Sequence, residues 1–370
     1  MSIVSKTITA ASVLAGLAAG SAAAAQAADT APLKDGRIGY AVADAHFSVY
    51  QTADGKAECP QGLNPMGPRE IFKQLWPNGG KMEDTILVRE GLNAFPADHP
   101  AQFPYLETQG NVGYGLNLDG KIGPKDFTSP EGEKGIDNAF YRVTGCATGF
   151  RGPDGQVQLF ASKFLRGFQY NRMMIEISGA DNLVNDADVD VTIMRGRDPL
   201  LLDSTGEKVA PGGSQRIDAR YGQKLIQRLH GKIENGVLTT EPVKNGIWAW
   251  QIESNHPRAL QIRDMRLQLK LTAAGADGML AGYFDVNTLL DWTMGYATHH
   301  LAYDRLDAPE FYWALRKNAD AYPDPKTGEM TALSSAITIN MAQVFIQHPE
   351  KAVAEQVTPE TAPVKAAAGR

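Results

Sequence analysis

Apolar and polar residues alternate with a period of two along much of the chain between about residues 157 and 283. The clearest apolar rows are Met173, Ile175 and Ile177; Val189, Val191 and Ile193; and Met265, Leu267, Leu269 and Leu271. This spacing places apolar side chains on one face of a β-strand and polar side chains on the other. The pattern therefore predicts a series of half-buried strands.

Turn signals separate these strands. Asn235 and Gly236 stand between two apolar runs, which predicts a tight hairpin. The Gly-rich stretch 274–278 predicts a longer connection. Repeated strands with polar turns favour an antiparallel sandwich or barrel. We predict a mainly β protein with an antiparallel β-sandwich-like central domain at 153–284.

The first 27 residues have the composition of an export signal. Lys6 precedes an uncharged stretch rich in Ala, Leu and Gly, and Ala25-Gln26-Ala27 has the small-x-small pattern of a cleavage site. The mature chain is expected to begin at Ala28, in a periplasmic or secreted location. No later stretch approaches the length of uncharged apolar sequence that a membrane-spanning helix needs, so we expect no transmembrane segment.

Residues 28–152 are dense in Gly, Pro, Asn and Asp, which predicts a loop-rich segment with few strands, one of them at 37–50, and a short helix after Pro68. Its two cysteines, Cys59 and Cys146, are the only ones in the chain. In an oxidising compartment they are expected to form a disulfide that pins this segment. The chain-entropy model gives such a long closed loop roughly 4–5 kcal/mol of stabilisation.

Residues 285–348 predict a helical C-terminal portion. Asp307 is a suitable helix N-cap, with Glu310 three residues later, for a helix that ends near Asn318. The stretch 332–346 fits either a strand or a helix. Residues 349–370, rich in Ala, Pro, Glu, Thr and Lys, predict a disordered tail.

The charge of the chain excludes one class of partner. The formal net charge of −6 becomes −7 once Lys6 is removed with the signal. A mildly acidic chain argues against binding to nucleic acid, because phosphates require a basic face.

Two acidic stretches are candidate calcium sites. Asp186, Asp188 and Asp190 are spaced to project from one face of a strand. Clustered carboxylates with no nitrogen or sulfur ligand suit calcium, although the spacing is not that of an EF-hand. The alternative is a solvated strand edge whose charges prevent aggregation.

The second stretch, 117–138, is a long loop with few apolar residues. Its predicted calcium ligands are Asp119, Asp126 and Asp137. The alternative is a loop held by hydrogen bonds and by the nearby disulfide. The sequence thus predicts either calcium or no cofactor.

Trp248 and Trp250 are spaced to share one face of a strand, on which sugar rings could stack. The alternative is that they belong to a core. No metalloprotease, haem, serine-hydrolase or nucleotide-binding motif is present.

We therefore expect an exported, non-catalytic binding protein of the cell envelope that recognises a partner protein or a glycan. Two alternatives stay open: a secreted hydrolase that uses loop carboxylates, and an accessory subunit of a periplasmic redox enzyme. The sequence leaves the ligand and the oligomeric state open.

Overall fold

The computed structural model describes residues 33–63, 106–152, 172–249, 259–290, 292–293 and 308–348, together with 73, 77–79, 87–89, 92–94, 155 and 157. The predicted export signal at 1–27, the helix expected after Pro68 except for residue 73, Trp250 and the predicted tail at 349–370 lie outside the described residues.

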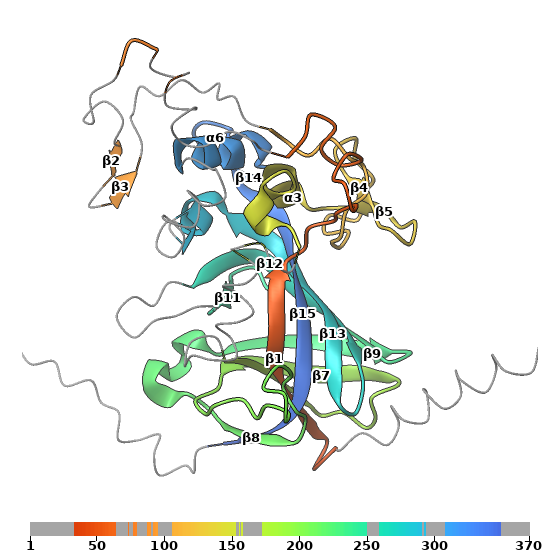
Figure 1. Ribbon diagram of the computed structural model, residues 1–370. Helices are drawn as coiled ribbons and strands as arrows, with labels where there is room; N and C mark the ends of the chain where they lie inside the picture. The colour runs from red at the N-terminus through yellow and green to blue at the C-terminus, as the bar shows by residue number, and fades with distance from the viewer. Residues whose placement is uncertain are drawn as a thin grey trace, which may run out of the picture.

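Eight antiparallel strands form a closed barrel (Figure 1). In order around the ring they are β1 (Arg37–Phe47), β6 (Met173–Ser178), β7 (Asp186–Arg195), β9 (Gln227–Glu234), β10 (Val237–Thr240), β12 (Leu260–Leu271), β13 (Gly275–Asp285) and β15 (Met330–Gln347). The ring closes because β15 pairs with β13 on one side and with β1 on the other, where Gly39 lies opposite Val344.

The predicted sandwich-like domain with a helical C-terminal portion is therefore wrong. The strand from the loop-rich N-terminal segment and the 18-residue strand β15 both belong to the barrel. Register shifts in β1, β7 and β12 allow the strands to bend into a ring. Alternation identifies the strands, but a sandwich and a barrel give the same alternation, so closure was not visible in the sequence.

Shorter elements surround the barrel. β8 (Gly213–Arg216) pairs with β15 in parallel, β11 (Gly246–Trp248) pairs with β12, and β14 (Ala321–Pro323) pairs with β15. Two separate hairpins are β2 (Leu87–Arg89) with β3 (Leu92–Ala94), and β4 (Phe127–Thr128) with β5 (Lys134–Ile136). The helical elements are α3 (Ala139–Thr144), η2 (Thr148–Phe150), η3 (Ala219–Leu225), residues 286–290 and α6 (Ala308–Asn318).

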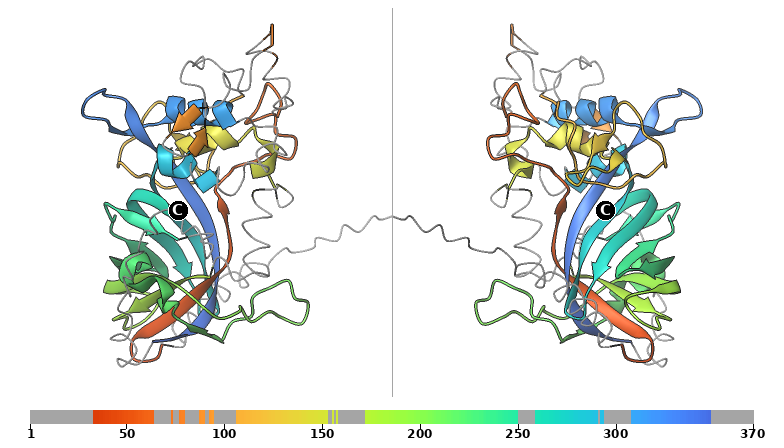
Figure 2. Two further views of the ribbon diagram at one scale, coloured as in Figure 1. Left: turned by 90° about the vertical axis from the view of Figure 1, so that its left-hand side faces the viewer. Right: turned by 90° about the vertical axis from the view of Figure 1, so that its right-hand side faces the viewer.

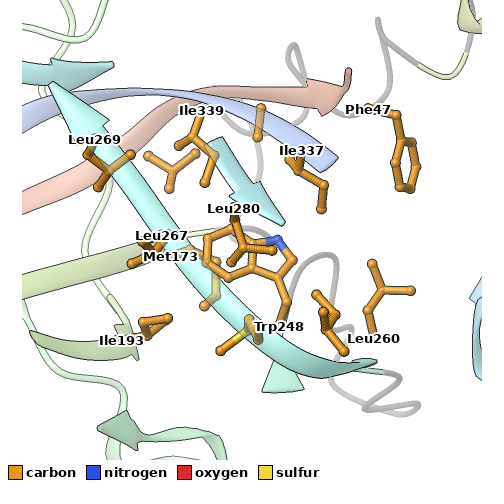
Figure 3. Close-up of a cluster of buried hydrophobic side chains, with 14 of the residues drawn as sticks. Phe47, Met173, Ile193, Trp248, Leu260, Leu267, Leu269, Leu280, Ile337 and Ile339 are labelled. Carbon is orange, nitrogen blue, oxygen red and sulfur yellow. The ribbon is translucent and has the colours of Figure 1, made fainter. Parts of the chain in front are cut away.

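Apolar side chains fill the barrel interior (Figure 3). An eight-stranded barrel has an interior just wide enough to be filled by side chains. Trp248, which is fully buried, lies in this core together with Leu267, Leu280 and Ile337. The interior of the barrel is thus filled by side chains, and the described pockets lie on the outside of the barrel.

Helices cover one end of the barrel (Figure 2). The ring of Phe47, at the end of β1, packs against those of Phe140 on α3 at 4.8 Å and Trp292 at 5.9 Å. Phe140 in turn contacts Phe311 on α6 at 6.3 Å. The helix predicted up to Asn318 is confirmed as α6. We call this helical layer the cap. Among the described residues, no helix has the length and apolarity to cross a membrane.

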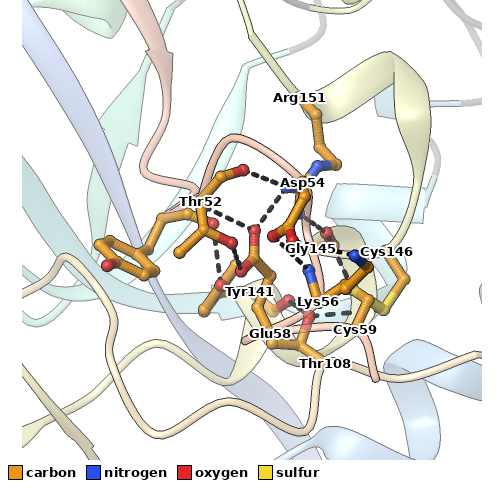
Figure 4. A network of polar contacts seen from close by, with 11 residues as sticks. Thr52, Asp54, Lys56, Glu58, Cys59, Thr108, Tyr141, Gly145, Cys146 and Arg151 are labelled. Atoms are coloured by element: carbon orange, nitrogen blue, oxygen red, sulfur yellow. Dashed lines mark hydrogen bonds and ion pairs between the residues drawn. A yellow bond between two sulfur atoms is a disulfide. The ribbon is translucent and has the colours of Figure 1, made fainter. Parts of the chain in front are cut away.

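The predicted disulfide between Cys59 and Cys146 is confirmed, with Cα atoms 5.8 Å apart. Next to it lies the buried Glu58, which forms an ion pair with Arg151 (Figure 4). Thr52 donates to the Glu58 carboxylate from its backbone N–H at 2.8 Å and from its hydroxyl at 2.6 Å. Burial acts to raise the pKa of Glu58, but the hydrogen bonds from Thr52 and Arg151 outweigh it, and the pKa lies below its usual value.

Candidate functional site

A pocket of about 490 Å³ lies where the cap meets the outer wall of the barrel. We call it the cap pocket. Its wall includes residues from the 106–138 region, α3, β13, α6 and β15. Three of the predicted calcium ligands, Asp119, Asp126 and Asp137, line it together. The structure thus brings together the acidic residues that the sequence singled out in this loop.

Asp137 is a partly buried carboxyl group of the pocket. It directly follows β5, and its Oδ2 accepts from the backbone N–H of Leu118 at 2.6 Å and of Asp119 at 3.4 Å. Burial raises the pKa of Asp137 to about 6, with further contributions from the negative charges of Asp126 and Asp119.

Asp119 and Asp126 each stabilise a local turn. An Oδ1 atom of Asp119 accepts from the backbone N–H of Lys121 at 2.8 Å, and Oδ2 of Asp126 accepts from the backbone N–H of Gly123 at 2.5 Å. Across the described ranges, no group of three or more His, Cys, Asp or Glu side chains is arranged to hold a metal ion. These bonds are the ones expected of a loop held by hydrogen bonds.

A fourth carboxylate, Asp320, comes from the chain after α6. Its oxygens accept from the backbone N–H of Ser334 at 2.8 Å and from the Ser334 hydroxyl at 2.6 Å. The same hydroxyl oxygen accepts from the backbone N–H of Ala139 at 2.8 Å, at the start of α3. The residue as a whole is exposed, but these bonds are partly buried, and desolvation raises the pKa of Asp320.

Tyr283 completes the acidic side of the pocket. It lies on β13 directly opposite Ser334 on β15, and it lines the pocket with Asp137 and Asp320. Burial raises the pKa of the Tyr283 phenol, and the charges of these two carboxylates raise it further. The phenol is therefore a neutral hydrogen-bonding group over the whole physiological pH range.

The cations of the pocket differ in how they are engaged. Arg142 donates to the carbonyl oxygens of Thr108 at 2.9 Å and Gly110 at 2.7 Å, and it lies 3.9 Å from the centre of the Phe127 ring. Lys317 forms an ion pair with Glu107 at 2.9 Å. Lys125 forms no ion pair with another described residue. The three central carboxylates, Asp126, Asp137 and Asp320, are held by N–H and O–H groups rather than by cations.

The three aspartates of the other acidic stretch, at 186, 188 and 190, lie in two different environments. Asp186 accepts from the backbone N–H groups of Asp181 at 2.7 Å and Asp188 at 3.1 Å. The exposed Asp188 and Asp190 instead contact the His230 ring, at 3.0 Å and 3.3 Å. These ion pairs raise the pKa of His230. The bulge between Asp186 and Val189 accounts for the separation, because it breaks the alternation of the strand.

Trp248 lies in the barrel core rather than at the cap pocket. Its position gives it a packing role. Tyr283, Asp320 and Ser334 were not identified as site residues from the sequence. They are far from the acidic loop along the chain, and only the pairing of β13 with β15 brings them beside it.

Comparisons with protein-family models, with curated proteins and with solved structures found no match for this chain. Its function must be argued from the geometry of the pockets.

Proposed function

We propose that this chain is an exported binding protein whose cap pocket holds a neutral glycan. One observation carries the proposal. Carboxylates, side-chain amides and a phenol from distant parts of the chain converge on one pocket of about 490 Å³. That volume lies within the usual range of ligand pockets.

The chemistry of the pocket wall favours a ligand with many hydroxyl groups. Ligand pockets are usually lined mainly by apolar side chains with a few polar groups. Here the lining is dominated by hydrogen-bonding side chains, including Asn111, Asn318 and Tyr283. A sugar hydroxyl both donates and accepts, so it can bond to carboxylates, amides and phenols alike.

The charge of the pocket argues against an anionic ligand. Five carboxylates and three cationic side chains line it, and Arg142 and Lys317 are already engaged within the protein. An anion would have to approach Asp126, Asp137 and Asp320 with only the Lys125 ammonium left to compensate their charges, which is costly in a partly desolvated site. A neutral polyhydroxylated ligand meets no such repulsion.

Titration calorimetry on the mature, disulfide-bonded protein tests this proposal. The neutral probes are cellotetraose, maltotetraose and chitotetraose, and the anionic control is tetragalacturonate. We expect at least one neutral tetraose to bind and Asp126→Asn to weaken that binding about tenfold, the scale of one lost hydrogen bond to a charged group. Glu234→Gln, in the β9–β10 hairpin, is the matched control. Failure of all neutral probes, or a preference for tetragalacturonate, overturns the proposal.

The carboxyl groups support glycan hydrolysis as a second candidate. A glycosidase pairs a protonated acid with an ionised carboxylate, and a raised pKa marks the acid. Asp137, with a pKa of about 6, lies in the same pocket as Asp320 and Asp126. With Asp137 as the acid, hydrolysis of methylumbelliferyl glycosides should fall as the pH rises above about 6. Asp137→Asn should abolish turnover but retain binding.

A further inference from the structure

A second and larger pocket, of about 690 Å³, lies on the outer wall of the barrel. We call it the wall pocket. Outward-facing residues of β6, β7 and β9 line it, and the segment 217–226, which contains η3, forms one side. Arg37 and His348 line it as well. It shares no lining residue with the cap pocket.

One part of the wall pocket is apolar. Met194 of β7 lines it together with Ile217 and Ile226. All three belong to a hydrophobic cluster on the outside of the barrel that also contains Met174 and Val344. This cluster provides a partly buried apolar surface. An apolar group of a ligand would be removed from water by packing against it, which is favourable.

The carboxylates of the wall pocket already have partners. The buried Glu176 contacts Nε2 of His348 at 2.8 Å and Nη1 of Arg37 at 3.5 Å. Asp218 accepts from Nε and Nη2 of Arg220 at 2.8 Å and 2.7 Å. Asp190 contacts His230, as described above. Glu176 and Asp218 are therefore balanced by arginines, whereas Asp190 shares the His230 ring with Asp188.

Arg228 is different. It lies on β9 directly opposite Thr192 of β7, and both residues line the pocket. Within the described part of the chain its guanidinium makes no ion pair or side-chain hydrogen bond. A guanidinium presents several N–H donors in a geometry that matches a carboxylate. Arg228 is thus an available anion-binding group beside an apolar surface.

We propose that the wall pocket binds a small amphipathic carboxylate. The headgroup pairs with Arg228 and accepts from the Thr192 hydroxyl, and the apolar body lies against Met194, Ile217 and Ile226. This inference does not depend on the glycan proposal, because the two pockets have different walls and opposite preferences for charge.

Decanoate is the probe for this site, and titration calorimetry on the mature, disulfide-bonded protein is the measurement. Decanol serves as the neutral probe of equal chain length, and acetate as the headgroup without the chain. We expect decanoate to bind more tightly than decanol, and acetate to show no saturable binding. Raising the salt concentration should weaken decanoate binding but should not weaken decanol binding, because only the charged headgroup is screened.

Two substitutions locate the site. Arg228→Gln should weaken decanoate binding about tenfold without affecting decanol, since it removes one charge-assisted contact. Arg228→Lys, which keeps the charge, should retain most of the affinity and guards against a folding defect in the glutamine variant. Lys224→Gln is the matched control, because Lys224 is exposed on η3 and does not line the pocket.

Filling the apolar part provides an independent test. Ile226→Trp should reduce binding of decanoate and decanol alike. The proposal is wrong if the unsubstituted protein binds no decanoate, or if Arg228→Gln binds it as tightly as the Lys224→Gln control does.

Discussion

Tyr283 and Ser334 lie directly opposite each other on β13 and β15, on the outer wall of the barrel. The Ser334 hydroxyl joins Asp320 to the first residue of α3, and Tyr283 lines the same pocket as Asp137. One cross-strand pair therefore couples the barrel to the cap and to the acidic loop. The geometry of the cap pocket depends on the register of these two strands.

Ser334→Ala should lower the free energy of unfolding by about 1–3 kcal/mol, because it leaves the Ala139 N–H without its acceptor and removes one of the two hydrogen bonds that Ser334 donates to Asp320. The neighbouring Ser335→Ala provides the control. Both serines are fully buried, but the Ser335 hydroxyl makes no hydrogen bond with another described residue. Ser335→Ala should therefore be neutral or stabilising. Urea unfolding of both variants gives the comparison, and equal losses would contradict the assigned role of Ser334.

Asp137→Asn should stabilise the protein at pH 8 and leave it unchanged near pH 3. The folded pKa of about 6 exceeds the usual value of 3.8, so the folded state holds the extra proton and stability falls as the pH rises through this window. The gain at pH 8 should be about 1–2 kcal/mol, since solvent screening reduces the ~1.4 kcal/mol per pKa unit. Urea unfolding across the pH range measures it. A gain that does not vary with pH would refute this account.

The stability contribution of Glu58 depends on pH in the opposite direction. Its pKa is lowered in the folded state, so its stabilising contribution is present above the unfolded pKa and disappears as the pH falls through the folded value. Glu58→Gln should cost about 3 kcal/mol at pH 7, because it breaks a buried ion pair with Arg151. The difference from the unsubstituted protein should shrink below pH 4. Thermal unfolding at pH 7 and pH 3 tests this dependence.

Replacing both Cys59 and Cys146 by Ser should lower stability by roughly 4–5 kcal/mol, the entropy of the 87-residue separation that the disulfide spans. Ligand binding by the folded fraction should keep its specificity, because neither cysteine lines the cap pocket or the wall pocket. Denaturant unfolding followed by calorimetric titration separates the two effects. A change in ligand preference would show that the bridge also shapes a site.

EDTA should leave the melting temperature of the protein unchanged. Asp119, Asp126 and Asp137 already accept hydrogen bonds from backbone N–H groups, so these carboxylates have partners within the protein. The measurement is thermal unfolding with and without EDTA, followed by addition of calcium. A melting temperature that falls with EDTA and returns with calcium would establish a cation site at this loop.

Local features of the fold were predictable from the sequence, and closure was not. Asn235 and Gly236 adopt the positive φ angles of the predicted tight hairpin, 50° and 78°. The disulfide followed from the residue count. Pairing of β1 with β15 joins opposite ends of the described chain, and no local pattern encodes such a register.

Some residues of the candidate sites could likewise be predicted from the sequence, and others could not. Asp137 was identified because acidic residues cluster along one loop. Tyr283 and Ser334 lie on strands whose polar residues look like ordinary exposed positions, and Asp320 lies in the connection between α6 and β14. Likewise, Arg228 has no distinguishing neighbour in sequence, and only the strands and the 217–226 segment around it reveal its position beside an apolar surface.

The pairing of Gly39 with Val344 also constrains when the protein can fold. When the chain is made starting from its N-terminus, the strands that fold early form an incomplete sheet. This sheet has two open edges until β15 is available. Contacts between such distant segments form slowly, and open edges can recruit other chains. If the chain is exported as proposed, a ring that cannot close until its last strand is available would leave the chain open during translocation. It also makes the chain dependent on protection from aggregation until that moment.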